Sequence, residues 1–260
     1  MAGSIINPAK LPPRARDSVC EQCHLAGEAR IPNPGKQISD FLPGENLEDT
    51  YTVYVFAGSR DPTHPSPLDV ISQSQQLALS RCARMSHGTL WCGTCHDPHE
   101  KPAHPEAYFR ARCLSCHGAA LLKTHPKPNT DCIGCHMPQL PVTNGGHTVF
   151  TDHRIAIYTA QQIAQGRSSN PAAPIGKTFQ SLVAWHAPPA PFTQRNLGLA
   201  DIEVGERSRS LALVSQGRQL LLSCRSKFPK DPTVLTGIGQ VMLGAADSQE
   251  AAELLQRVVQ

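Results

Sequence analysis

The sequence predicts a mainly helical fold with much irregular structure and with helical hairpins at its C-terminus. Sixteen of the 23 prolines fall within residues 1–150, where they leave room only for short helices. Beyond residue 198 proline becomes rare, and apolar residues recur at the spacing of a helix face. A single run, residues 51–56, has the β-branched and aromatic composition of a strand.

The N-terminal part should therefore consist of loops, one strand and a few short helices. Residues 72–84 contain no proline and place apolar side chains among polar ones, which predicts a helix, and residues 108–116 predict a second. Residues 161–197 are rich in Ser, Ala and Pro and are expected to connect two domains. The predicted division is residues 1–160, 161–197 and 198–260.

An internal repeat supports the C-terminal hairpins. Comparing this region with itself at an offset of 34 residues aligns Val204 with Ile238 and Leu221 with Leu255. Thirty-four residues is the period of tetratricopeptide repeats, in which paired helices pack through small and apolar positions. In this register those positions are Leu235, Ile238, Gly239, Met242, Ala251 and Leu255. An ordinary helical hairpin is the alternative.

Composition excludes several classes of protein. With 40% hydrophobic and 17% charged residues, the chain is too apolar to be disordered throughout. A net charge of +3 without a basic stripe argues against nucleic acid as a partner. No apolar run is long enough to span a membrane, and residues 1–16 lack the apolar stretch of a signal peptide. Aromatic residues, at 5%, are few for filling an interior.

Eight of the ten cysteines belong to four motifs of one form, C-x-x-C-H. The motifs are Cys20/Cys23/His24, Cys92/Cys95/His96, Cys113/Cys116/His117 and Cys132/Cys135/His136. Two thiols at this spacing reach the two vinyl groups of a porphyrin, and the imidazole that follows binds the iron. The motifs predict four covalently attached c-type haems, which would also supply the apolar area that the scarce aromatic residues do not.

Other chemistry of paired cysteines fits less well. Structural zinc sites use such pairs but do not require a histidine directly after each one. Thioredoxin-like chemistry uses one motif after a strand of a βαβ unit, and no such pattern precedes these four. Disulfide bonds would leave the twelve histidines unexplained. The remaining thiols, Cys82 and Cys224, are expected to be buried.

Each iron needs a sixth ligand, which is usually a histidine or a methionine. Met85 is the only methionine suitably placed to be one, so these ligands are expected among the other eight histidines. Ligation by two histidines implies low potentials, since a methionine ligand raises them. Position favours four residues that follow or flank the motifs: His99, His125, His147 and His153. The others, His64, His87, His104 and His186, are expected to be mostly solvated.

The segments that carry these motifs resemble multihaem c-type cytochromes related to the small tetrahaem cytochromes of nitrogen metabolism, fused to C-terminal tetratricopeptide repeats. The resemblance rests on Asp17-Ser-Val-Cys-Glu-Gln-Cys-His24, Leu90-Trp-Cys-Gly-Thr-Cys-His-Asp-Pro-His99, Ala111-Arg-Cys-Leu-Ser-Cys-His117, Cys132-Ile-Gly-Cys-His-Met-Pro138 and His147-Thr-Val-Phe-Thr-Asp-His153. It implies that His99, His125, His147 and His153 include the distal ligands. Family members usually have a histidine where this chain has Gln73, and further haem motifs upstream.

The expected function is electron transfer between redox proteins outside the cytoplasm, in the periplasm or the extracellular space, where the resemblance implies that haem is attached. The expected partners are an electron donor and an acceptor, other multihaem cytochromes among them, and the subunits could assemble into a homo-oligomer or a stack. The repeats would be a docking surface. The alternative is a reductase or oxidase of small nitrogen or oxygen species at one open haem, near Gln73, Arg84 and His87. A third hypothesis is a scaffold with structural haems.

Overall fold

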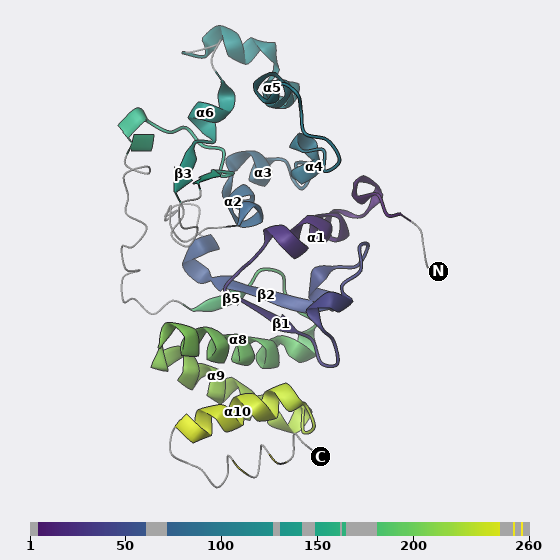
Figure 1. The fold of residues 1–260 in the computed structure, drawn as a ribbon, viewed down its shortest axis with the longest axis vertical. Helices are drawn as coiled ribbons and strands as arrows, with labels where there is room; N and C mark the ends of the chain where they lie inside the picture. Colours follow the sequence, from purple (N-terminus) through teal and green to yellow (C-terminus); the bar gives the residue numbers. More distant parts are fainter. Residues whose placement is uncertain are drawn as a thin grey trace. The chain divides into compact units, whose positions relative to one another are not determined.

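The computed structural model describes residues 5–60, 72–126, 131–141, 149–161, 163–164 and 181–244, with Ala252 and Gln256. The described chain is mainly helical with a small amount of sheet (Figure 1), as the sequence predicts. It forms two compact units, each made of two segments. The first unit comprises Met1–Cys20 and Ser59–Gly176, and the second comprises Glu21–Gly58 and Lys177–Gln260.

Short helices dominate the first unit. Helix α1 (Pro13–His24) begins with proline, whose missing N–H costs nothing at a helix start, and its last four residues continue into the second unit. The other elements are η1 (Pro8–Lys10), α2 (Gln73–Leu79), α3 (Arg81–Met85), α4 (Cys92–Cys95), α5 (Pro105–Thr124), α6 (Cys132–His136) and the antiparallel strands β3 (Gln139–Pro141) and β4 (Val149–Thr151).

Both predicted helices form, with differences that have local causes. The segment 72–84 divides into α2 and α3 because Ser80 has an extended backbone and its hydroxyl accepts a hydrogen bond from the Ala83 amide at 3.0 Å, capping α3. The segment 108–116 lies within the longer α5. That helix bends at Gly118, where φ is +65°, a conformation that glycine adopts without strain.

The first unit has almost no apolar interior in its described part. Ala15 and Pro138 are its only buried apolar residues there. The other buried residues are all polar: Arg16, Ser18, Ser72, Gln75, Gln76, Ser80 and Asp152. Burial of apolar area is the main force that stabilises a folded domain. The described side chains of this unit supply very little of it.

The second unit is built on a three-stranded antiparallel sheet with the order β1-β2-β5. Strand β2 (Tyr51–Phe56) coincides with the predicted strand and lies at the centre. It pairs with β1 (Ala29–Pro32) and with β5 (Leu182–Ala184). Strand β5 lies within residues 161–197, the expected connector. The division at residues 160 and 197 stays a prediction.

Three helices complete the second unit, together with the short 3-10 helices η2 (Ile38–Asp40), η3 (Leu47–Asp49), η5 (Ala190–Phe192) and η6 (Arg225–Lys227). A further 3-10 helix, η4 (Ala57–Arg60), begins in the second unit and ends in the first. Figure 1 shows α8 (Thr193–Ser208) along the sheet, followed by α9 (Leu211–Cys224) and α10 (Pro232–Gly244). The backbones of α8 and α9 meet at two glycines: a Cβ on Gly217 would lie 2.6 Å from the carbonyl oxygen of Gly198. This contact therefore requires residues without side chains.

Apolar residues of the second unit gather into three clusters. In the cluster between the helices, Leu235, Ile238 and Met242 are at most 2% exposed, and Gly239 is also buried. These are four of the predicted repeat positions; Ala251 and Leu255 lie outside the described residues. Cys224, 1% exposed, is buried as expected, whereas Cys82 is only half-buried. The 34-residue repeat itself stays a prediction.

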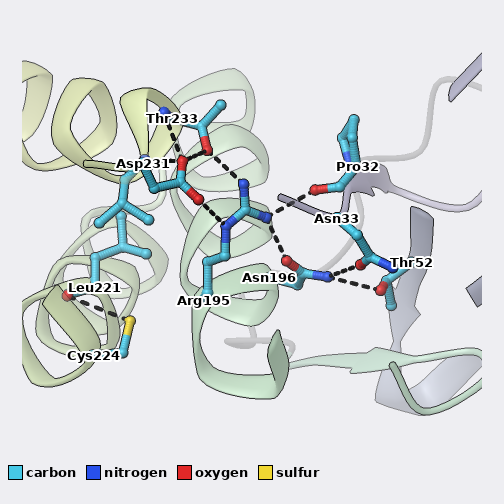
Figure 2. Close-up of polar contacts among 10 residues, drawn as sticks. Pro32, Asn33, Thr52, Arg195, Asn196, Leu221, Cys224, Asp231 and Thr233 are labelled. Atoms are coloured by element: carbon cyan, nitrogen blue, oxygen red, sulfur yellow. Dashed lines mark hydrogen bonds and ion pairs between the residues drawn. The ribbon is translucent and has the colours of Figure 1, made fainter. Parts of the chain in front are cut away.

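A buried arginine links α8 to α10 and to the sheet (Figure 2). The Arg195 side chain, 3% exposed, donates from Nε to Asp231 Oδ2 at 2.7 Å and from Nη2 to the Thr233 hydroxyl at 2.6 Å. Its Nη1 donates to the carbonyl oxygen of Pro32 at 2.8 Å. A guanidinium carries donors in a fixed fork, so one side chain satisfies all three acceptors.

The residue after this arginine extends the same network. The Asn196 side chain accepts from Arg195 Nη1 and donates from Nδ2 to Asn33 Oδ1 at 2.8 Å and to the Thr52 hydroxyl at 3.0 Å (Figure 2). Asn196 is fully buried, and these contacts prevent the cost of an unpaired amide there.

Candidate haem-attachment sites

Each C-x-x-C-H motif lies on a helix. The first ends α1, the second forms α4 with His96 directly after it, the third lies inside α5, and the fourth forms α6. Residues three positions apart share a helix face, so each cysteine pair presents both thiols on one side. All ten cysteines are described, and none forms a disulfide bond.

The two cysteines of a motif differ in exposure. Cys23, Cys116 and Cys135, each the second cysteine of its motif, are exposed, whereas the first cysteine of every motif is half-buried. A cysteine that attaches a cofactor forming the core of a unit is expected to face the interior, and these three do not. Cys23 and Cys135 each lie one residue before the end of a helix, α1 and α6, whereas Cys116 lies within α5. The assignment of Cys23, Cys116 and Cys135 to thioether bonds therefore rests on the motif spacing and not on burial.

Caps fix the two shortest of these helices. The Asp131 carboxylate accepts hydrogen bonds from the amides of Ile133 and Gly134 at 3.0 and 2.9 Å, at the start of α6. At α4, the Thr94 hydroxyl accepts from the Trp91 amide at 3.1 Å. Helices of four and five residues are unstable alone, and such caps hold the cysteine pairs in helical geometry.

Thiols of consecutive motifs are neighbours. A hydrogen bond with Cys20, together with burial, raises the pKa of the Cys92 thiol. Burial raises the pKa of Cys113 to about 11, with a smaller contribution from the adjacent Cys132. Burial also raises the pKa of Cys95, and the nearby Cys116 adds to that rise. Thiol hydrogen bonds therefore join the first motif to the second and the third to the fourth, and an electrostatic interaction relates the second to the third.

Helix α1 is fixed to the segment before α4 by one arginine. The Arg16 guanidinium lies over the Trp91 ring, 4.9 Å from its centroid, and donates to the carbonyl oxygen of Gly88 at 3.0 Å. Arg16 is 8% exposed, so the stacking takes place largely away from water, where a cation–π contact is strongest. This holds the first and second motifs together independently of the thiol contact.

Two pairs of histidines have the spacing of axial ligands. The ring centroids of His96 and His153 are 6.1 Å apart, and those of His125 and His136 are 6.0 Å apart. Imidazoles that bind one metal from opposite sides have centroids about 6 Å apart, because each metal–nitrogen bond is about 2 Å and the ring centre lies about 1 Å beyond the nitrogen. Each pair joins a motif histidine to a predicted distal histidine.

Backbone carbonyls orient one ring of each pair. His153 Nδ1 lies 2.8 Å from the carbonyl oxygen of Thr151, and His136 Nδ1 lies 2.9 Å from that of Ala156. A carbonyl oxygen only accepts hydrogen bonds, so these Nδ1 atoms carry the proton and the neutral rings have their lone pair on Nε2. Histidines that bind metal through Nε2 are held in this way.

The other predicted ligands are less closely defined. His24, His99 and His117 are exposed, and His147 lies outside the described residues, so the distal ligands of the first and third motifs stay unassigned. His87 and His104 are exposed, as expected, and His64 is not described. His186 is half-buried rather than solvated, with Nε2 at 3.3 Å from Glu21 Oε1. Gln73 is half-buried at the start of α2.

Some contacts at these sites had no counterpart in the sequence reasoning. The carbonyl of Ala156 is a backbone group, which any residue type could supply. Gln76 accepts a hydrogen bond from the His153 amide at 2.8 Å. It lies three residues beyond Gln73, on the segment where the resembling family usually has a distal histidine, and nothing in the local sequence marks it as a partner of His153.

Comparisons with protein-family models, with curated proteins and with solved structures found no match. Within the described parts of the chain, no three His, Cys, Asp or Glu side chains converge as a metal-ion site. A haem iron needs only two axial side chains, because the porphyrin supplies four nitrogens. None of the described helices combines the length and apolar character needed to cross a membrane.

Proposed function

We propose that this chain is a multihaem c-type cytochrome that carries four covalently attached haems and transfers single electrons between redox proteins. The observation that carries the proposal is the coincidence of two features. Each of the four C-x-x-C-H motifs lies on a helix, and two motif histidines each have a second histidine ring whose centroid lies about 6 Å away, a distance that axial ligands also have.

The lack of an apolar interior in the first unit also fits haem. A macrocycle offers several times the apolar area of a Phe side chain, which buries about 150–250 Å². Four such groups would supply the burial that the described side chains of the first unit do not. The fold of this unit would then depend on its cofactors, as small metal-organised domains depend on theirs.

Each residue has a defined role in this proposal. The eight motif cysteines, the exposed Cys23, Cys116 and Cys135 included, would form the thioether bonds. The motif histidines His24, His96, His117 and His136 would be the proximal ligands. His153 would be the distal ligand opposite His96, and His125 opposite His136. Bound haem supplies one-electron chemistry, and ligation by two histidines favours low potentials and leaves no position for a substrate.

The adjacency of consecutive motifs favours electron relay. Thiol hydrogen bonds join the first motif to the second and the third to the fourth, and the thiols of the second and third motifs lie close enough to interact electrostatically. We propose donor and acceptor proteins, other multihaem cytochromes included, as partners and the periplasm or extracellular space as the location. Helices α8, α9 and α10 would supply a docking surface, and self-assembly into stacks is compatible with this function.

A reductase or oxidase of small nitrogen species is the second candidate. It is favoured by Gln73, an amide at the position where the resembling family usually has a distal histidine, and by Arg84 and His87, which follow it in the sequence and could donate protons. An amide oxygen is a poor ligand for low-spin iron, so a haem there could keep an open position.

Spectra of the matured holoprotein distinguish the two functions. An electron carrier should show low-spin ferric haems that are reduced reversibly at low potential, with spectra unchanged by nitrite or hydroxylamine. A high-spin ferric haem that binds either compound would instead support the enzyme. Haems that cannot be reduced reversibly would contradict electron transfer and favour a structural scaffold.

A further inference from the structure

We propose that Gln76 is a positioning residue that holds His153 in place opposite His96 through its hydrogen bond to the His153 backbone. This inference rests on the proposed function, because it assumes a haem at the second motif. It assigns a role to a residue that touches neither the cofactor nor the iron.

The contact joins two segments that are distant in sequence. Gln76 lies on α2 and is 7% exposed, and its Oε1 accepts from the His153 amide at 2.8 Å. His153 lies two residues beyond the end of β4. A buried amide that meets a backbone N–H satisfies both polar groups, so breaking this bond leaves an unpaired donor at the turn.

The turn that carries His153 is rigid in itself. The Asp152 side chain, 2% exposed, accepts from the Arg154 amide at 2.9 Å and from the Tyr158 hydroxyl at 2.7 Å, and forms an ion pair with the Arg154 guanidinium. The Asp152 amide donates to the carbonyl oxygen of Pro138 at 3.0 Å. Because of these contacts, any displacement of His153 requires the whole turn to move.

Gln76 connects this rigid turn to α2, which packs against α3. Ring position matters because an axial bond of about 2 Å tolerates little displacement, and residues around metal ligands act by limiting it. His96, on the other side, is positioned by α4 and lies 5.5 Å from the Phe109 ring of α5. Gln76 thus limits the movement of His153 relative to a proximal ligand that is held separately.

The glutamine-rich face of α2 has a different role in this proposal from that of the corresponding segment in the resembling family. Gln73 stands where a distal histidine was expected, and Gln76 lies three positions later, on the same face of α2. The role we infer for this face is to hold a distal histidine supplied by another segment, not to supply the ligand itself.

The test uses the full-length, haem-loaded protein and the variant Gln76→Leu. The matched control is Gln75→Leu, which changes a neighbouring glutamine of similar burial, 5% exposed, on the same helix. We expect both variants to keep the parent's haem mass. In Gln76→Leu, about one haem should change from low-spin to high-spin in ferric electron paramagnetic resonance spectra, and added imidazole should restore the low-spin signal. Gln75→Leu should match the parent.

A second variant covers the case in which Gln76→Leu does not mature. Gln76→Asn keeps the amide but shortens it by one methylene, so its oxygen no longer reaches the His153 amide, and the same spin change is expected. Unchanged low-spin spectra in Gln76→Asn, or equal losses in Gln75→Leu, would overturn the inference. A parent without attached haem would instead refute the proposed function. A haem-loaded His153→Ala variant with parental spectra would show that His153 is not a ligand, and would refute the positioning role while leaving haem attachment intact.

Discussion

Two buried aspartates of the second unit have opposite electrostatic environments. Burial tends to raise the pKa of Asp231, but hydrogen bonds from Arg195 and Thr233 outweigh it and hold the pKa below its ordinary value. Asp201, on α8, is fully buried, and neither carboxylate oxygen has a hydrogen-bond partner in the described structure. Burial raises its pKa to about 7. Asp201 therefore destabilises the fold whenever it is ionised.

This difference gives a prediction for Asp201→Asn. Because the pKa of Asp201 is higher in the folded state than in the unfolded state, stability contributed by its protonated form is present below about pH 4 and lost as the pH rises to about 7. The variant should lose less stability than the parent over this range, by on the order of 4 kcal/mol, because the shift is roughly 3 pKa units and each unit corresponds to about 1.4 kcal/mol. Urea unfolding of both holoproteins at pH 4 and pH 8, followed by far-ultraviolet circular dichroism, measures this; identical pH dependence would contradict it.

At the scale of elements, the α8–α9 hairpin depends on close backbone contact. A Cβ on Gly198 would lie 2.8 Å from Leu221, and one on Gly217 would lie 2.6 Å from the Gly198 carbonyl oxygen. Neither neighbour can move without separating the helices or displacing Leu221, which is fully buried. The small residues at this crossing set the distance between the helices, whether or not the 34-residue repeat holds.

We therefore expect Gly217→Ala to destabilise the second unit by about 1–3 kcal/mol, the usual cost of overpacking. Gly58→Ala is a matched control in the same unit, because a Cβ there would meet nothing within 4 Å. Urea midpoints of the two holoprotein variants provide the comparison. Equal midpoints would show that the hairpin accommodates a side chain at Gly217 and that the close approach is not required.

The elements differ in how far the sequence could define them. Strand β2 matched residues 51–56 because its composition is distinctive. Of the motif helices, only part of α5 was predicted, because α4 and α6 have four and five residues, too few for a recognisable helical pattern. The exposure of Cys23, Cys116 and Cys135 does not follow from the motif spacing, because exposure depends on how the surrounding chain packs. Strand β5 has three residues, too few for a recognisable pattern. The distance between His96 and His153 is a tertiary property, so local sequence indicated candidate ligands but not their pairing.

At the scale of the whole molecule, the two units are stabilised by different means. All three apolar clusters found in the described chain belong to the second unit, whereas the buried residues of the first unit are mostly polar. By the proposed function, covalently attached cofactors supply the missing apolar interior. Folding of the first unit should therefore depend on haem, and folding of the second should not.

Hydrogen exchange of the chain made without haem attachment tests this difference. We expect amides in residues 29–56 and 182–244 to stay protected, because the second unit keeps its core. Amides in residues 92–136 should exchange at the rate of an unfolded chain and become protected only in the holoprotein. Equal protection of residues 92–136 with and without haem would show that this unit folds without cofactors.

The most direct test of the central claim is the intact mass of the full chain after maturation in a host that attaches c-type haem. The account predicts the mass of the polypeptide plus four haems, with the colour remaining on the protein after acid-acetone extraction. In the Cys116→Ser variant, the third haem should have one thioether bond instead of two and should therefore be attached less securely. Three or fewer haems on the parent chain would refute at least one motif, and a colourless protein of polypeptide mass would contradict the account.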